Sequence, residues 1–281
     1  MNDADGRKPR LKQAPPIQVA QQAAAEPGTV KRVLLLLRCL VDHPGETAQS
    51  LARRVNLPRS TVHRLLTTLC ADQYAMQDPS GTFEPGLEMY RLAGKLAPGM
   101  PYVKLAESHL QALSKQFRET SILTLLERQQ LKMFHAACGS PSDPMRYNIR
   151  LNALEPLLWG ATARVVLAHL TDKEISEVVA RREPSPVSGV VAKEQELRKS
   201  LRQIREEGAA ITNSHRTPGT IGVAAPFFDG EGKVIGSLGL LIPEFRWSKH
   251  QADTIIQALK GTAAALSRQL GHSPVHRVEH V

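Results

Sequence analysis

The sequence predicts an α+β chain of two domains, in which a small helical domain precedes a larger domain built on a mixed sheet. Three observations support this fold class. The length of 281 residues is enough for two domains of ordinary size. Apolar residues recur with a helical period up to about residue 97, and Pro98–Pro101 then interrupts the chain. Beyond that point, alternating strand-like runs are flanked by helical segments, which is typical of a sheet with helices on one face.

Composition and charge narrow the class of protein. Apolar residues make up 42% of the chain and charged residues 22%, as in globular proteins. The net charge of +9 permits binding to nucleic acid or to an anionic surface. No apolar run approaches the roughly 20 residues of a membrane span, and no signal peptide is recognisable. Cys39, Cys70 and Cys138 are scattered, as thiols in a reducing compartment are. We therefore expect a cytoplasmic protein without a membrane partner.

The first elements are a tail and an apolar helix. Residues 1–28 mix Pro, Gln and Ala without an apolar period, so we expect a disordered tail. Residues 29–42 predict a helix with Thr29 as its N-cap. Its valines and leucines form a stripe that is too wide for one neighbour. The width indicates burial on two sides, one of them against a second copy of the chain.

The next segments have the spacing of a helix-turn-helix followed by a hairpin. Short helices are expected at 47–55 and 58–71, with the small residue Ala52 where the two helices cross. The turn between them needs a left-handed backbone, and Asn56 tolerates that conformation better than most residues. Residues 74–83 alternate around a turn and predict a β-hairpin. Together these elements, within residues 29–85, predict a winged helix-turn-helix.

The polar side of this pair of helices has one sign of charge. Residues 47–70 contain four arginines and no acidic residue. An exposed helix of a small α domain would explain the amphipathic pattern, but phosphate explains the missing carboxylates. Winged helices place the start of their third helix in the major groove of DNA. For His63, a base contact and simple exposure fit equally well. The expected DNA-binding residues are Thr47, Ser50, Arg53, Arg59, Ser60, Thr61, His63, Arg64 and Thr67.

The remaining chain predicts a linker helix and a sheet domain. Residues 86–100 contain the linker helix, residues 101–271 form the second domain, and residues 272–281 are a tail. Within the second domain we expect helices at 101–118, 161–170, 172–181, 193–207 and 248–270, and strands within 121–138, 146–151, 209–216, 221–229 and 233–242.

These motifs resemble the IclR family of bacterial transcriptional regulators. The resemblance rests on "LARRVNLPRSTVHRLLTTL" and the wing "DPSGTFEPG", and on "LEPLLWGATARVVLAHL" and "GTIGVAAPFFDGEGKVIGSLGLLIP" in the second half. It covers about residues 30–270. It implies a winged helix-turn-helix, a linker helix and a GAF-like effector-binding domain. It also implies dimers or tetramers that bind a palindromic operator in double-stranded DNA and respond to a small organic effector, often a carboxylic acid.

The resemblance also implies a ligand site between the loop at residues 159–162 and the strands that carry Thr212, Gly222, Gly239 and Leu241. This sequence departs from the family at Ser214 and His215, where acidic residues are common, and at Gly222, where cysteine is common. It also departs at Gly239 and Leu241, where the family has polar residues. These departures and the flat ring of Trp159 favour an acid with a bulky or aromatic body. Free N–H groups at the start of the helix near Ala161 would hold its carboxylate. The alternative is a pocket that no longer binds a ligand. The implied effector-binding residues are Trp159, Gly160, Ala161, Thr162, Thr212, Gly222, Gly239 and Leu241.

No catalytic residue, cofactor or metal site is expected. The sequence has no HExxH, GxSxG or GxxxxGK[ST] pattern. His272, His276 and His280 are four residues apart, but Pro274 lies among them in a tail. Two other classes remain as alternatives. One is a GAF-like sensor or enzyme module with an accessory DNA-binding domain, for which no nucleophile and base are evident. The other is an architectural DNA-binding protein, which would leave the second domain without a role.

Overall fold

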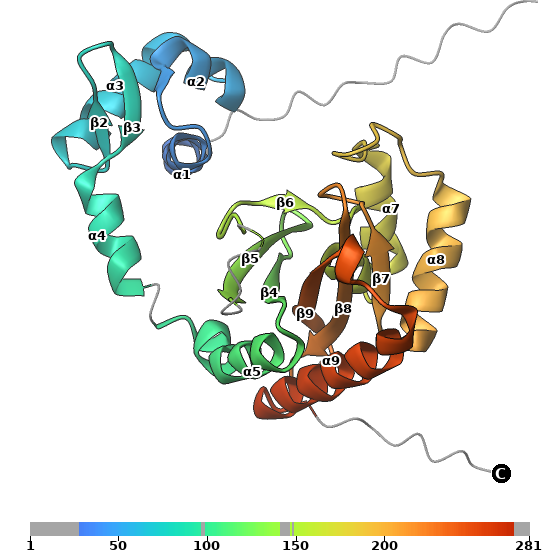
Figure 1. Cartoon of the computed structure of the whole chain (residues 1–281). Coiled ribbons are helices and arrows are strands. Elements are labelled where there is room, and N and C mark those ends of the chain that lie inside the picture. The colour runs from blue at the N-terminus through green and yellow to red at the C-terminus, as the bar shows by residue number, and fades with distance from the viewer. Residues whose placement is uncertain (1–27, 97–98, 141–146, 148, 273–281) are drawn as a thin grey trace, which may run out of the picture. The chain divides into compact units, whose positions relative to one another are not determined.

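The computed structural model describes residues 28–96, 99–140, 147 and 149–272. It divides into two compact units, Met1–Tyr90 and Arg91–Val281, which are described separately (Figure 1). The expected tails lie outside the described residues, apart from Gly28 and His272. None of the helices in the described part is long and apolar enough to cross a membrane.

The described part of the first unit is a winged helix-turn-helix, as predicted. Its three-stranded antiparallel sheet has the order β1-β3-β2. Leu36, Leu51, Val62 and Leu66 are fully buried and join the helices in one core. The elements are α1 (Thr29–Asp42), β1 (Glu46–Thr47), α2 (Ala48–Val55), α3 (Arg59–Ala71), β2 (Ala75–Gln77) and β3 (Thr82–Pro85).

Local backbone chemistry explains the ends of these helices. Asn56 has φ 51° and ψ 50°, the left-handed conformation predicted for the turn. Thr47 is the N-cap of α2, and its hydroxyl accepts a hydrogen bond from the Ser50 N–H (3.3 Å). The cap expected at Thr29 is wrong, because Gly28 occupies the N-cap position of α1 and makes no side-chain cap bond. Thr29 is instead the first helical residue.

Helix α4 (Leu87–Leu96) lies at the boundary between the two units, where the linker helix is expected. None of its residues is buried, although several are apolar. Leu87, Tyr90 and Leu96 are 62–71% exposed. Leu87 and Tyr90 are three residues apart and so lie on one side of the helix, and exposed apolar neighbours of this kind are typical of a contact surface.

The second unit is an antiparallel six-stranded sheet with the order β6-β5-β4-β9-β8-β7. Its described elements are α5 (Pro101–Phe117), β4 (Thr120–Glu127), β5 (Lys132–Gly139), β6 (Glu155–Pro156), α6 (Ala161–Leu167), α7 (Asp172–Ala180), α8 (Glu194–Glu207), β7 (Ala210–Asn213), β8 (Thr220–Phe228), β9 (Val234–Pro243), η2 (Glu244–Arg246) and α9 (Lys249–Gln269).

Helices cover both faces of this sheet, so the expectation of one covered face is wrong. Helices α5 and α9 pack on one face with Val223 and Phe227 of β8 (Figure 1). Helices α6, α7 and α8 belong to the core of the other face, which includes Ala224. The seven residues from Ile221 to Phe227 are all buried, and a continuous apolar run is what a strand buried on both faces requires.

The strand expected at 146–151 is also wrong for the residues that the structure describes. Tyr147, Ile149 and Arg150 belong to no strand, and a turn follows them. Asn152 has φ 59°, which breaks an extended run, and its N–H donates to the His135 carbonyl oxygen (2.9 Å). The strand that pairs with β5 on the side away from β4 is instead β6, in which Glu155 pairs with Met133.

Candidate functional site

Helix α3 presents the polar face that the sequence predicts. Val62, Leu65 and Leu66 are buried, whereas the predicted DNA-binding residues on the other side are exposed or half-buried. Within the described part of the chain, Arg53, Arg59 and Arg64 make no ion pair. The exposed members are Arg59, Ser60, His63, Arg64 and Thr67, and Thr61 is half-buried beside them.

Glu46 lies one residue before the segment 47–70 that contains no acidic residue, and its carboxylate contacts α2. Glu46 lies 2.6 Å from an Arg54 guanidinium nitrogen and accepts a hydrogen bond from the Ser50 hydroxyl (2.8 Å). The hydrogen bonds from Arg54 and then Ser50 lower the pKa of Glu46 to about 2. The Ser50 hydroxyl and the Arg54 guanidinium are therefore already paired with a carboxylate of the same chain. Sequence reasoning missed this because it counted charges from residue 47 onward.

Two further hydroxyls of the predicted DNA-binding set are used locally. The Thr67 hydroxyl donates to the His63 carbonyl oxygen (3.0 Å). The Thr47 hydroxyl caps α2, as described above. Within the described part of the chain, Arg59, Ser60, Thr61, His63 and Arg64 make no side-chain hydrogen bond or ion pair, so their polar groups are free to bind a partner.

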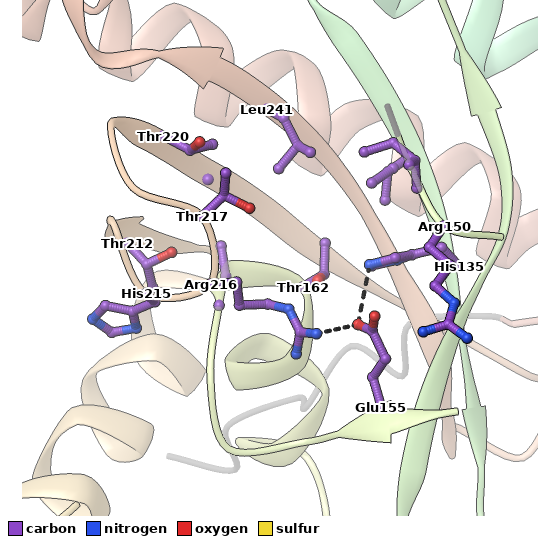
Figure 2. A pocket seen from close by; sticks show the side chains of 15 residues that line it. His135, Arg150, Glu155, Thr162, Thr212, His215, Arg216, Thr217, Thr220 and Leu241 are labelled. Carbon is purple, nitrogen blue, oxygen red and sulfur yellow. Dashed lines mark hydrogen bonds and ion pairs between the residues drawn. The ribbon is translucent and has the colours of Figure 1, made fainter. Parts of the chain in front are cut away.

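The second unit contains a pocket of about 270 Å³ between the sheet and the start of α6 (Figure 2). Ile122, Ile149 and Leu241 supply aliphatic surface, and none of the described lining residues is Phe, Tyr or Trp. The complete lining is Ile122, His135, Ile149, Arg150, Glu155, Gly160, Ala161, Thr162, Thr212, His215, Arg216, Thr217, Thr220, Gly222 and Leu241.

Most of the effector-binding residues implied by the resemblance line this pocket, but two do not. Gly160, Ala161, Thr162, Thr212, Gly222 and Leu241 lie on its wall. Trp159 packs elsewhere: its Nε1–H donates to the Glu183 carbonyl oxygen (3.0 Å), and its ring contacts His215 and Arg164. At Gly239, a Cβ would come within 2.8 Å of the Thr162 Cγ2 atom. That glycine therefore permits close packing of α6 on β9 and does not enlarge the pocket.

The pocket also brings together charged residues that sequence reasoning missed. Arg216, on the loop between β7 and β8, forms an ion pair with Glu155 of β6 (Figure 2). His135 Nε2 lies 3.7 Å from a Glu155 carboxylate oxygen, and His135 Nδ1 lies 2.9 Å from the Thr124 hydroxyl. Burial, and then the Arg216 charge, lower the pKa of His135 to about 4, so its ring is neutral at pH 7. Arg150 lines the pocket and makes no ion pair with a described residue.

Threonine hydroxyls surround the same space. Thr162, Thr212 and Thr220 are buried. The Thr220 Oγ1 atom is buried and makes no hydrogen bond within the described part of the chain. Because buried polar groups are almost always paired, this hydroxyl is a candidate to bind a ligand or a water.

The described residues form no recognisable metal site. No group of three His, Cys, Asp or Glu side chains there could hold a metal ion. Cys39, Cys70 and Cys138 are free thiols. The histidines at 276 and 280 lie outside the described residues.

The two units define a class of protein: a DNA-binding regulator with a winged helix-turn-helix and a separate domain that carries a ligand pocket. Models of known families agree. The IclR helix-turn-helix domain matches residues 29–79, and the C-terminal domain of bacterial IclR transcriptional regulators matches residues 96–268. The chain therefore belongs to the IclR family.

Individual relatives span nearly the whole chain. The regulator KdgR of Dickeya chrysanthemi is 25% identical over 246 residues, which cover 87% of this chain and 80% of KdgR. The regulator TtgV of Pseudomonas putida is 25% identical over 247 residues, which cover 87% of this chain and 92% of TtgV. Curated relatives are named as transcriptional regulators, so this chain is a regulator and not an enzyme.

Solved structures share the fold. A putative IclR regulator from Silicibacter sp. TM1040 superposes with a TM-score of 0.78 at 22% identity, covering 88% of this chain and 97% of that one. An IclR homologue from Microbacterium hydrocarbonoxydans, solved with 4-hydroxybenzoate, superposes with a TM-score of 0.68 at 22% identity, covering 86% of this chain and 98% of that one.

Proposed function

We propose that this regulator binds a palindromic operator as a dimer or tetramer and that an organic acid in the pocket controls the binding. The observation that carries the proposal is the exposed face of α3, where arginines stand without carboxylate partners among the described residues. In this proposal residues 29–85 bind DNA, 86–100 form the linker helix and 101–271 bind the effector. A regulator of this kind acts where the chromosome is, so we place it in the cytoplasm.

Arg59 and Arg64 are the side chains best suited to contact DNA. Arg59 is the first residue of α3, and winged helices enter the major groove with that end. A guanidinium can bind guanine O6 and N7 with two hydrogen bonds, or it can bind a phosphate. The first turn of α3 contains no acidic residue that would repel the backbone. Ser60, Thr61 and His63 lie on the same side and complete the proposed contact surface.

Exposed apolar residues support assembly. Val30, Leu34 and Val41 of α1 are 50–75% exposed and lie on one side of the helix, because they are spaced four and seven residues apart. Helix α4 adds Leu87, Tyr90 and Leu96, which were described above. A second copy that covered these side chains would also supply the second half of a palindromic site.

The charge of the pocket supports an acid as the effector. Arg150 and Arg216 bring two positive charges and Glu155 one negative charge, while burial keeps His135 neutral. His215 also has a lowered pKa, because of burial and then the Arg164 charge. The pocket thus carries a net positive charge that suits a monoanion. The homologue solved with 4-hydroxybenzoate holds such an acid. The expectation that Trp159 forms a flat wall of the pocket is wrong, because Trp159 does not line it.

The test is selection of genomic DNA fragments by the full chain, followed by titration of the selected site and of random DNA. Arg59→Ala should weaken binding to the selected site by about 1–3 kcal/mol and binding to random DNA by less. Arg202→Ala, which removes an exposed arginine from α8, is the matched control and should change neither. If no fragment is enriched, or if Arg59→Ala binds like the unaltered chain, the proposed DNA-binding face is wrong.

A further inference from the structure

The ion pair in the pocket joins two walls that are far apart in the sequence. Glu155 lies on β6, at one edge of the sheet, and Arg216 lies on the loop between β7 and β8, 61 residues later. Figure 2 shows the two side chains reaching toward each other across the pocket. Their side chains keep 20% and 25% exposure, so the pair is partly shielded from water and still accessible from the pocket. A carboxylate is therefore already bound to the Arg216 guanidinium, and it belongs to the protein.

The backbone at Gly160 helps to hold Arg216 in this position. A Cβ at residue 160 would lie 2.7 Å from Arg216 Cδ and 3.1 Å from Cγ. The arginine stem thus packs directly on the glycine, and its guanidinium is directed at the pocket. An arginine held in this way is well placed to bind a carboxylate through two parallel hydrogen bonds.

Glu155 has a second neighbour to which it could turn. The His135 ring is 3.7 Å away and is held on its other side by the Thr124 hydroxyl. If another carboxylate occupied Arg216, a small rotation would bring Glu155 within hydrogen-bond distance of His135 Nε2. Glu155 can therefore leave Arg216 without becoming a buried charge that lacks a partner, which would be unfavourable.

We propose that Glu155 is an internal competitor for the effector, and that an acid binds this pocket by replacing the Glu155 carboxylate on Arg216. This inference rests on the proposed function, which assigns an organic acid to the pocket. It makes Arg216 and Glu155 the residues that determine specificity. A ligand without a carboxylate cannot replace Glu155, whereas an acid that also carries a hydroxyl or carbonyl group can pair with Thr220 Oγ1. Replacing an ion pair also weakens binding, so this pocket should respond only to high concentrations of the acid.

The experiment compares acid binding by the full chain and its variants in a calorimeter. The probes are acetate, 4-hydroxybenzoate and the uncharged 4-hydroxybenzamide. Glu155→Gln removes the competing charge and should bind the acids about five- to tenfold more tightly, given that a partly exposed ion pair contributes about 1 kcal/mol. Arg216→Gln should bind them at least about tenfold more weakly. Glu155→Gln should bring no gain for the amide.

Glu174→Gln is the matched control. Glu174 pairs with Arg128 at 2.6 Å and is 19% exposed, close to the exposure of Glu155, but it lies outside the pocket. The Glu174→Gln substitution removes one negative charge, as Glu155→Gln does, and should leave acid binding unchanged. Arg216→Lys keeps the positive charge and should bind the acids more tightly than Arg216→Gln does, which separates loss of charge from loss of folding.

Three results would overturn the proposal: Glu155→Gln binds the acids no more tightly than the unaltered chain, Arg216→Gln still binds them, or neither acid binds any variant although Glu155→Gln leaves Arg216 open. Binding to the selected DNA is measured on the same variants. If the unaltered chain does not bind DNA specifically, the proposed function is wrong. The calorimetric comparison of the variants would still decide whether Glu155 competes with the acid.

Discussion

Replacing Gly160 with alanine tests the geometry on which the pocket depends. Gly160 precedes α6 with φ 90° and ψ 155°, a region of backbone space that is essentially open only to glycine. Holding another residue there costs about 1–3 kcal/mol. The new methyl group would also meet Arg216 Cδ at 2.7 Å, so the arginine stem must move away. Gly160→Ala should therefore both destabilise the second unit and weaken acid binding.

The size of the effect follows from the size of the unit. About 2 kcal/mol of strain should lower the Tm by about 4–8 °C in a domain of 150–250 residues. Trp159 and Trp247 are the chain's two tryptophans, and both lie in the second unit. Thermal unfolding of the full chain followed by tryptophan fluorescence therefore reports on this unit, without interference from the DNA-binding unit.

Gly222→Ala is the control, because Gly222 also lines the pocket but has no positive φ. Its added Cβ would lie 3.2 Å from Thr212 Oγ1 and 3.3 Å from Ala161 Cβ, contacts that a shift of a few tenths of an ångström relieves. We expect a smaller decrease in Tm than for Gly160→Ala. An unchanged Tm for Gly160→Ala, or an equal decrease for both variants, would refute the reasoning from the backbone angles.

Three more predictions concern pH, assembly and salt. The folded pKa of His135, about 4, lies below the ordinary 6.5, so the folded ring binds a proton less readily than the unfolded one. The free energy of unfolding should consequently decrease by about 3 kcal/mol as the pH falls from 6.5 through 4. His135→Gln should remove this part of the pH dependence in urea unfolding, and an unchanged slope would contradict it. Sedimentation should show at least a dimer that Leu34→Glu together with Tyr90→Glu weakens; a monomeric unaltered chain would argue against the exposed residues as an interface. Operator affinity should decrease steeply with salt, because neutralised phosphates release counterions; salt-independent binding would exclude an arginine–phosphate interface.

The exposed polar face of α3 could be predicted from the sequence because its determinants are local. Val62, Leu65 and Leu66 mark the buried side of α3, and the helical period then places Arg59 and Arg64 on the exposed side. The left-handed turn at Asn56 could be predicted for the same reason, since few residues adopt that conformation. Glu46 was missed although it is close in the sequence, because its contact with Arg54 depends on how the chain enters α2.

The sequence by itself determined the winged helix-turn-helix, the order of most elements and the loop at the start of α6, because backbone preferences and apolar periods act over a few residues. Only the tertiary structure decided which side chains face the pocket. Glu155 and Arg216 meet because β6, at one edge of the sheet, and the loop that follows β7, at the other edge, both reach the pocket at the start of α6, and no local pattern encodes that approach. The side chain of Trp159 is directed away from the pocket by its hydrogen bond to the Glu183 carbonyl, which is 24 residues away. Side-chain direction at a site is set by such long-range packing, so a motif can locate the site and still leave its chemistry undecided.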